Sequence, residues 1–252
     1  METPAPTSAP PAPGIGPKPW GLPAVLLALV LPMLLWASSL AISVSTDTER
    51  DLSDGEIIVG LVITIIVLDG MFIGLAAGLA LWRYHLGWRE LGLRAFDRAF
   101  WWLPPVAAAG AWVAVIAYGA VLTAVGAEAA VPEQEELEQL FQSRAVLPLT
   151  GVATVLVAPL AEEIFFRGFV FAGLLRPFGL VGAMLGSGLL FAAFHVTGPE
   201  TLGLILPFGL IGILFAWVYY RTGSLWLSIA THLLFNLVSF AALASLAGSA
   251  SA

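Results

Sequence analysis

The 252-residue chain contains no cysteine and few charged residues. The lack of cysteine excludes disulfide bonds, thiolate nucleophiles and cysteine-based metal sites. Only 11% of the residues are charged and 59% are hydrophobic, with a mean hydropathy of +0.94, whereas soluble domains carry about 25% charged residues. The formal charge of −7 comes mostly from two acidic stretches and from acids inside apolar runs, so it does not indicate one acidic binding surface. The composition therefore excludes an ordinary soluble globular protein.

What the sequence does contain is a series of long apolar runs. They lie at about 20–45, 55–82, 100–126, 147–175, 178–196, 203–220 and 224–247. A helix needs roughly 20 apolar residues to span a bilayer, whose core offers no water to pair with the backbone. The runs are continuous rather than alternating, which excludes a β-barrel. The sequence predicts an all-α polytopic transmembrane bundle of about seven helices, or eight if one run holds two.

The composition between the runs predicts how the chain is organised. Residues 1–19 are rich in Pro, Ala, Thr and Ser, which predicts a disordered cytoplasmic tail; a signal peptide is disfavoured because a clustered basic start and a small-x-small cleavage site are both lacking. Transmembrane helices are predicted at 20–126, with a basic interfacial segment or a solvated loop at 83–98. An acidic outer loop at 127–146 and a C-terminal transmembrane core at 147–247 complete the division.

The positive residues predict the orientation of the bundle. With a cytoplasmic N-terminus, the inner segments hold Lys18, Arg83, Arg89, Arg94, Arg98, Arg176 and Arg221, and the outer segments hold Arg50 and Arg144. Positively charged residues accumulate on the cytoplasmic side of membrane proteins. We therefore expect an integral protein of the plasma membrane with its N-terminus in the cytoplasm, and an odd helix count places the C-terminus outside.

Three charged residues lie deep inside the run at 147–175, where each costs roughly 2.5–3.5 kcal/mol to insert. Glu163 and Arg167 are four residues apart on one helical face, in the order that favours an ion pair. Glu162 points about 100° away from them and lacks this partner. The spacing predicts that Glu163 is structural and that Glu162 is free to act as a general base. Pro159 removes one backbone hydrogen bond just before this pair.

Two later runs carry matching polar groups. Phe191 and His195 are four residues apart in one of them, and His232 and Asn236 are four apart in the other, so each pair projects from one helical face. A carboxylate, two imidazoles and an amide from three helices can meet only inside a bundle, where imidazole and amide groups suit water activation and oxyanion stabilisation. Taken singly, each is explained equally well by interhelical hydrogen bonding. Asp69, inside the second run, is assigned a packing or cavity role.

Three motifs thus occur in order along the chain: Glu162-Glu163-x-x-x-Arg167, Phe191-x-x-x-His195 and His232-x-x-x-Asn236. Over roughly residues 147–240 they resemble the three-motif pattern of the CPBP (CAAX protease and bacteriocin-processing, also called Abi) intramembrane proteases. The resemblance implies an endopeptidase in which Glu162 and His195 activate the hydrolytic water and His232 and Asn236 stabilise the oxyanion. Glu163, Arg167 and Phe191 would be the supporting residues.

The need for a metal ion is the main alternative within this hypothesis, because the family has been described both as metalloprotease and as glutamate-type protease. The sequence has no His-Glu-x-x-His motif, but Glu162, His195 and His232 are of the types that bind zinc. The amide of Asn236 favours water activation by glutamate, so we predict no cofactor, with zinc as the alternative.

The predicted partners are the lipid bilayer and a membrane-associated protein or peptide substrate, and no nucleic acid is expected. A prenylated protein, a bacteriocin-like peptide and a role in bacteriocin immunity are equally open, and the oligomeric state is not indicated. Rival functions are a proton-coupled transporter, for which an internal repeat is lacking, and a non-catalytic membrane scaffold.

Overall fold

The structure, a computed structural model, describes residues 15–16, 18–45, 53–127, 141 and 143–250. In this part of the chain it is all-helical and contains no strand, which confirms the predicted all-α class. The N-terminal half comprises α1 (Leu22–Ser45), α2 (Asp54–Thr64), η1 (Ile65–Asp69), α3 (Gly70–Ala77), η2 (Gly78–Arg83), η3 (Arg98–Phe100) and α4 (Leu103–Ala124). The C-terminal half comprises α6 (Leu147–Gly151), η5 (Val152–Val157), α7 (Ala158–Glu162), η6 (Glu163–Phe171), α8 (Ala172–Phe194), η7 (Pro199–Leu204), α9 (Ile205–Thr222) and α10 (Leu225–Ala250).

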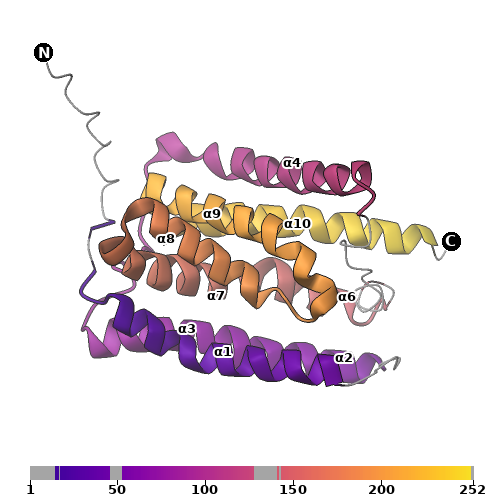
Figure 1. The fold of residues 1–252 in the computed structure, drawn as a ribbon, viewed down its shortest axis with the longest axis horizontal. Helices are drawn as coiled ribbons and strands as arrows, with labels where there is room; N and C mark the ends of the chain where they lie inside the picture. The colour runs from indigo at the N-terminus through magenta and orange to yellow at the C-terminus, as the bar shows by residue number, and fades with distance from the viewer. Residues whose placement is uncertain (1–14, 17, 46–52, 128–140, 142, 251–252) are drawn as a thin grey trace, which may run out of the picture.

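The helices lie side by side with their axes along the long dimension of the molecule (Figure 1). Helix α1 and the continuous stretch from α2 to η2 form one side, and α4 forms the opposite side. The helices from α6 to α10 fill the space between them, where α8 packs chiefly against α9 and α10 packs against α4 and α9. The three motif-bearing segments therefore occupy the centre of the bundle.

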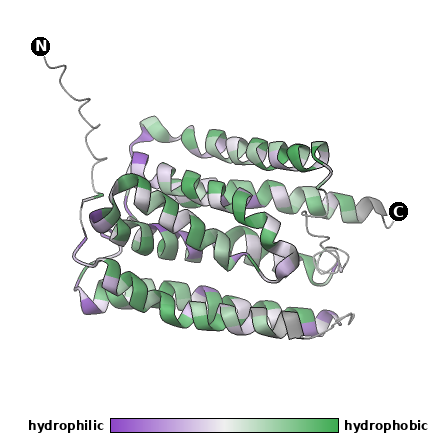
Figure 2. Ribbon diagram, in the orientation of Figure 1, coloured by the Kyte–Doolittle hydropathy of each residue, from purple (hydrophilic) through white to green (hydrophobic). Residues whose placement is uncertain are grey.

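The helices of the bundle consist mostly of hydrophobic residues along their length (Figure 2). Side chains such as Leu27, Ile66 and Val181 are more than 60% exposed, which suits contact with lipid chains but not with water. Among the described residues, six helical stretches are long and apolar enough to cross a membrane: Leu22–Ser39, Asp54–Arg83, Arg98–Ala124, Leu147–Phe194, Thr201–Thr222 and Leu225–Ala247. The chain is an integral membrane protein.

The stretch Leu147–Phe194 is too long for a single crossing. Its 48 residues would extend about 72 Å as one α-helix, more than twice the roughly 30 Å hydrocarbon core. Gly179 interrupts it with φ 65° and ψ −173°, a conformation open mainly to glycine. Ser187 Oγ then donates a hydrogen bond to the Phe166 carbonyl at 2.9 Å. The chain therefore reverses at Gly179 and runs back beside η6, close to the predicted boundary between the runs at 147–175 and 178–196.

The segments predicted to lie outside the helices are only partly described. Residues 1–14 and 17 of the predicted tail, and residues 128–140 and 142 of the predicted outer loop, lie outside the described residues. Ile15 is 4% exposed and Lys18 donates a hydrogen bond to the Glu90 carbonyl. Burial and the nearby Arg94 guanidinium lower the pKa of Lys18. Packed structure thus begins before the predicted boundary at residue 20.

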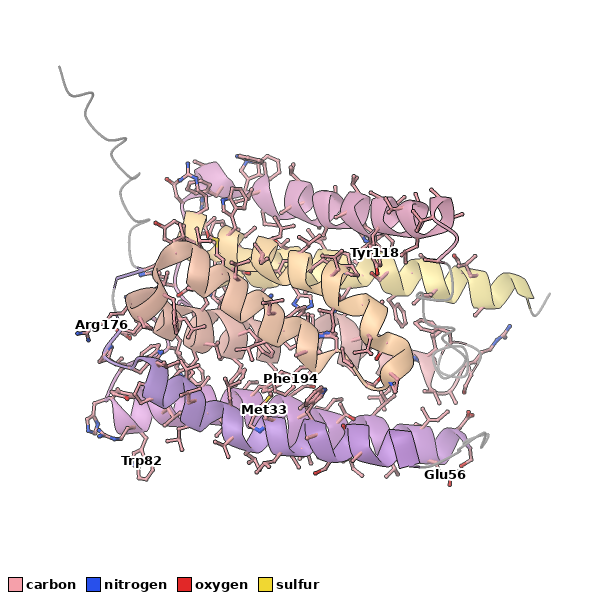
Figure 3. The ribbon with its side chains drawn as sticks, in the orientation of Figure 1. Met33, Glu56, Trp82, Tyr118, Arg176 and Phe194 are labelled. Carbon is pink, nitrogen blue, oxygen red and sulfur yellow. The ribbon has the colours of Figure 1, made fainter. Side chains whose placement is uncertain are left out.

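The basic segment at 83–98 is a loop of turns fixed to the bundle. Leu91 is fully buried, and Ser224 Oγ donates a hydrogen bond to the Arg94 carbonyl at 2.6 Å. These contacts hold the segment against α9 and α10. Figure 3 places Trp82 and Arg176 at one end of the bundle and Glu56 at the other.

Helices α8 and α9 approach closely because glycines face each other. A Cβ atom on Gly212 would lie 2.8 Å from the Gly188 Cα, and one on Gly188 would lie 2.9 Å from the Gly209 carbonyl oxygen. Small residues at a membrane helix interface allow such contact between backbones. The close approach places the Gly212 carbonyl oxygen 3.2 Å from Arg167 Nη2. This carbonyl is therefore a hydrogen-bond acceptor for the buried arginine.

We expect Gly212→Val to force these helices apart and to lower the stability of the protein by about 1–3 kcal/mol, as overpacking does. Thermal unfolding of the purified protein in detergent measures this as a fall in Tm. Gly110→Val is the matched control, because a Cβ at Gly110 in α4 meets nothing within 4 Å. Equal Tm values for the two variants would contradict the close-packing argument.

Candidate active site

The two adjacent glutamates have different surroundings. Glu162 ends α7, lines a cavity and has a side chain that is 15% exposed. Glu163 begins η6, which is wound as a π-helix, and its side chain is completely buried and outside the lining of the cavity. π-helical turns are rare and occur often at functional sites. The two carboxylates therefore separate, as the helical spacing predicts.

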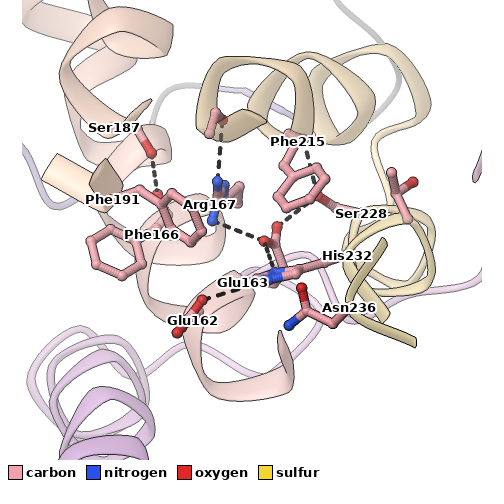
Figure 4. A network of polar contacts seen from close by, with 12 residues as sticks. Glu162, Glu163, Phe166, Arg167, Ser187, Phe191, Phe215, Ser228, His232 and Asn236 are labelled. Carbon is pink, nitrogen blue, oxygen red and sulfur yellow. Dashed lines mark hydrogen bonds and ion pairs between the residues drawn. The ribbon is translucent and has the colours of Figure 1, made fainter. Parts of the chain in front are cut away.

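Three side chains contact the buried carboxylate of Glu163 (Figure 4). Arg167 Nη1 lies 2.8 Å from Oε1, so the ion pair predicted from the sequence is present. Ser228 Oγ donates a hydrogen bond to Oε2 at 2.6 Å, and His232 Nδ1 lies 3.0 Å from Oε1. A buried charge is tolerated only when it is paired and hydrogen-bonded in this way. Glu163 thus joins η6 to α10.

Arg167 is equally buried and is surrounded by aromatic rings. Its guanidinium carbon lies 4.4 Å from the centroid of Phe191 and 5.2 Å from that of Phe215. Its Nη2 donates a hydrogen bond to the Gly212 carbonyl at 3.2 Å. Ring faces attract cations, most strongly where water is excluded. Phe191, predicted as a supporting residue, therefore contacts the cation that neutralises Glu163.

His232 lies between the two glutamates. Its Nδ1 faces Glu163, and its Nε2 lies 3.8 Å from Glu162 Oε2, which is beyond hydrogen-bonding distance. Glu162 Oε2 is itself buried and has no hydrogen-bond partner in the described part of the chain. A buried carboxylate oxygen without a partner is uncommon. Glu162 is therefore placed to accept a hydrogen bond from a molecule that enters the cavity.

His195 ends α8 and is fixed by its own helix and by α9. Its Nδ1 lies 2.8 Å from the Phe191 carbonyl oxygen, and its ring stacks on Phe208 with a centroid distance of 4.5 Å. When Nδ1 carries the proton and donates it to this carbonyl, Nε2 is available as an acceptor.

Asn236 lies one turn beyond His232 on α10. Its Nδ2 donates a hydrogen bond to the Thr154 carbonyl oxygen at 2.8 Å. An amide group carries two N–H donors, so this bond orients the group and leaves one donor and the carbonyl oxygen for other contacts.

A single cavity of about 210 Å³ joins these groups. Its lining comprises Thr154, Ala158, Glu162, Phe191, His195, Phe208, Ile211, His232, Phe235 and Asn236. The four residues predicted to be catalytic, Glu162, His195, His232 and Asn236, all belong to this lining although they span 75 positions of the sequence. A mostly apolar cavity with a few convergent polar groups is the typical form of a ligand site.

Two contributors to the site were not predicted from the sequence. Ser228 is completely buried and contacts Glu163. Its position four residues before His232, on the same helical face, is a sequence pattern that could have predicted this contact. Phe208 stacks on His195, but a phenylalanine in an apolar run carries no sequence signal for such a role. Asp69, assigned a packing or cavity role, is 5% exposed at the end of η1 and does not line the cavity.

The zinc alternative was tested against the geometry of the candidate ligands. Among the residues that the structure describes, no three His, Asp or Glu side chains gather closely enough to hold a metal ion. His232 Nδ1 faces Glu163, and His195 Nδ1 faces a backbone carbonyl. The described side chains do not form a metal site as they stand.

Comparison with known proteins identifies the region that contains the site. Residues 144–238 match the family described as Rce1-like, "Type II CAAX prenyl endopeptidase Rce1-like". The protein named "Putative membrane peptidase YdiL" of Bacillus subtilis (strain 168) is 28% identical over 104 residues, which cover 41% of this chain and 41% of that relative. The chain thus matches about two fifths of the length of this curated relative. No solved structure matches the chain.

The helices that carry the buried polar site are thus similar to those of a class of membrane peptidases. The region 144–238, which matches the Rce1-like family of type II CAAX prenyl endopeptidases, contains every predicted site residue. This confirms the resemblance predicted from the three motifs.

We expect Arg167→Met to leave the carboxylate of Glu163 buried without its counter-ion and to destabilise the protein by about 3–5 kcal/mol. Thermal unfolding in detergent measures the loss, and Arg176→Met, at an exposed arginine, is the control. The double variant Glu163→Gln/Arg167→Met removes both charges and is expected to recover much of the Tm. A stable single variant, or a double variant no better than the single one, would refute the argument.

Proposed function

We propose that this protein is an intramembrane endopeptidase that hydrolyses a peptide bond of a membrane-associated protein or peptide. The observation that carries the proposal is the convergence of Glu162, His195, His232 and Asn236 on one cavity in the bundle. The family that this region matches supports the same reaction. A peptide bond that enters the cavity would meet a carboxylate, two imidazoles and an amide in surroundings that limit the access of water.

Glu162 is the proposed general base. Its side chain is 15% exposed and lines the cavity, so a water molecule in the cavity can reach the carboxylate. Glu162 accepts a proton as the water oxygen forms a bond to the carbonyl carbon of the substrate. The proton then passes to the leaving amine as the carbon–nitrogen bond breaks. His195 is proposed to orient the water through Nε2.

His232 and Asn236 are the proposed oxyanion stabilisers. The contact between Nδ1 and Glu163 holds the ring of His232 with Nε2 towards Glu162, where an Nε2–H would donate to the oxyanion. Asn236 donates one N–H to Thr154 and keeps the other for the developing negative charge. Oriented donors of this kind typically contribute a factor of about 10²–10³ in rate.

The proposal extends to the placement of the protein in its membrane. We infer seven crossings, because the reversal at Gly179 divides the longest of the six apolar stretches into two. The N-terminus is then cytoplasmic and the C-terminus outside, in the plasma membrane, by the distribution of positive charge. The substrate is proposed only by class, as a membrane-associated protein or peptide.

We expect Glu162→Gln to lower kcat at least about 100-fold, because it removes the proton acceptor but keeps the shape of the side chain. The purified protein in liposomes, supplied with quenched-fluorescent membrane peptides, provides the measurement. Glu56→Gln, at the far end of α2, is the matched control and should cleave like the wild type. Undiminished cleavage by Glu162→Gln would overturn the mechanism.

Metal dependence is tested separately. We expect incubation with a strong zinc chelator to change kcat by less than about twofold, because the proposed base acts on water directly. Cleavage is measured before and after chelation and after added zinc. Loss of cleavage that zinc alone restores would show that the protein is a metalloprotease.

A further inference from the structure

A change of backbone register lies directly before the two glutamates. Segment η5, from Val152 to Val157, is wound as a π-helix, and the Ala158 N–H donates its hydrogen bond to the Ala153 carbonyl five residues earlier. In the same register the next bond would run from residue 159 to the Thr154 carbonyl. Residue 159 is proline, which has no backbone N–H. The Thr154 carbonyl therefore lacks its partner in this register.

The side chain of Asn236 takes the place of this missing donor. Its Nδ2 donates to the Thr154 carbonyl oxygen at 2.8 Å, across 82 positions of the sequence. Thr154 and Asn236 both line the cavity. Beyond the proline the α-helical register returns, since the Glu163 N–H bonds to the Pro159 carbonyl. The Thr154 carbonyl at the cavity wall thus has no backbone donor in this register, and the Asn236 side chain donates a hydrogen bond to it.

We propose that Pro159 is a positioning residue for Asn236. By withholding a backbone N–H, it keeps the Thr154 carbonyl available to fix the amide of Asn236, so that the second N–H of that amide points at the reacting carbonyl. This inference rests on the proposed function, because it concerns the group proposed to stabilise the oxyanion. It assigns a role in catalysis to Pro159, which would otherwise be explained only as a residue that bends the helix.

The hydrogen bond to Thr154 matters because it fixes the orientation of the Asn236 amide. The terminal amide of a free asparagine rotates broadly about its last torsion angle, whereas a donor for an oxyanion acts best when it is held in place before the reaction. An alanine at position 159 would carry an N–H that competes for the Thr154 carbonyl. The hydrogen bond that anchors Asn236 would then be weakened although Asn236 itself had not been changed.

Kinetics of four proteins test this link: wild type, Pro159→Ala, Asn236→Ala and the double variant. We expect Pro159→Ala to lower kcat at least about tenfold with KM within about twofold, because misplacement of a catalytic group costs rate more than binding. In the Asn236→Ala background the same change should have less than about a twofold effect, since coupled residues are non-additive. Leu160→Ala, which shortens the side chain at the next position, is the control. Its effect on kcat should be additive with that of Asn236→Ala.

Thermal unfolding of the same four proteins gives a readout that does not depend on cleavage. We expect Asn236→Ala to lower the Tm less in the Pro159→Ala background than in the wild type, because the hydrogen bond to Thr154 is already weakened there. Additive effects of the two substitutions on both kcat and Tm would overturn the inference. If Tm shows the coupling but Glu162→Gln still cleaves normally, the proposed mechanism fails and the positioning of Asn236 by Pro159 stands.

Discussion

The buried ion pair between Glu163 and Arg167 is the interaction on which the rest of the site depends. Both side chains are completely buried, with 2.8 Å between the charged atoms. Two such charges inside an apolar bundle require further polar partners. Three residues on two other helices provide them. Ser228 and His232 of α10 contact the carboxylate, and the Gly212 carbonyl of α9 contacts the guanidinium. Stabilising one ion pair thus fixes the relative positions of η6, α9 and α10.

The same network separates the two neighbouring carboxylates. Glu163 is in contact with three side chains, whereas Glu162 Oε2 has no hydrogen-bond partner among the described residues. His232 connects them, because its Nδ1 contacts Glu163 while its Nε2 faces Glu162. An imidazole oriented by a buried carboxylate on one side presents a defined nitrogen on the other. The reactivity proposed for Glu162 therefore follows from the full pairing of Glu163.

Much of this site could be predicted from helical spacing alone. The four-residue intervals between Glu163 and Arg167 and between His232 and Asn236 place each pair on one face, and the cost of buried charge predicts that they meet. The relative depth of the helices could not be predicted. The π-helical turns of η5 and η6 change the rise and the direction of side chains, and their hydrogen-bond register leaves no pattern in the sequence. The contact between Pro159, Thr154 and Asn236 depends on that register.

The position of α10 after the other elements of the site has a consequence for biosynthesis. Glu163 and Arg167 belong to one helix and can neutralise each other as soon as that helix enters the bilayer. His232 and Asn236 arrive only with α10, which is translated after η6, α8 and α9. Until then the growing chain contains the neutralised Glu163–Arg167 pair, but its cavity is incomplete. The order of residues along the polypeptide thus delays assembly of the proposed catalytic site until α10 has been inserted.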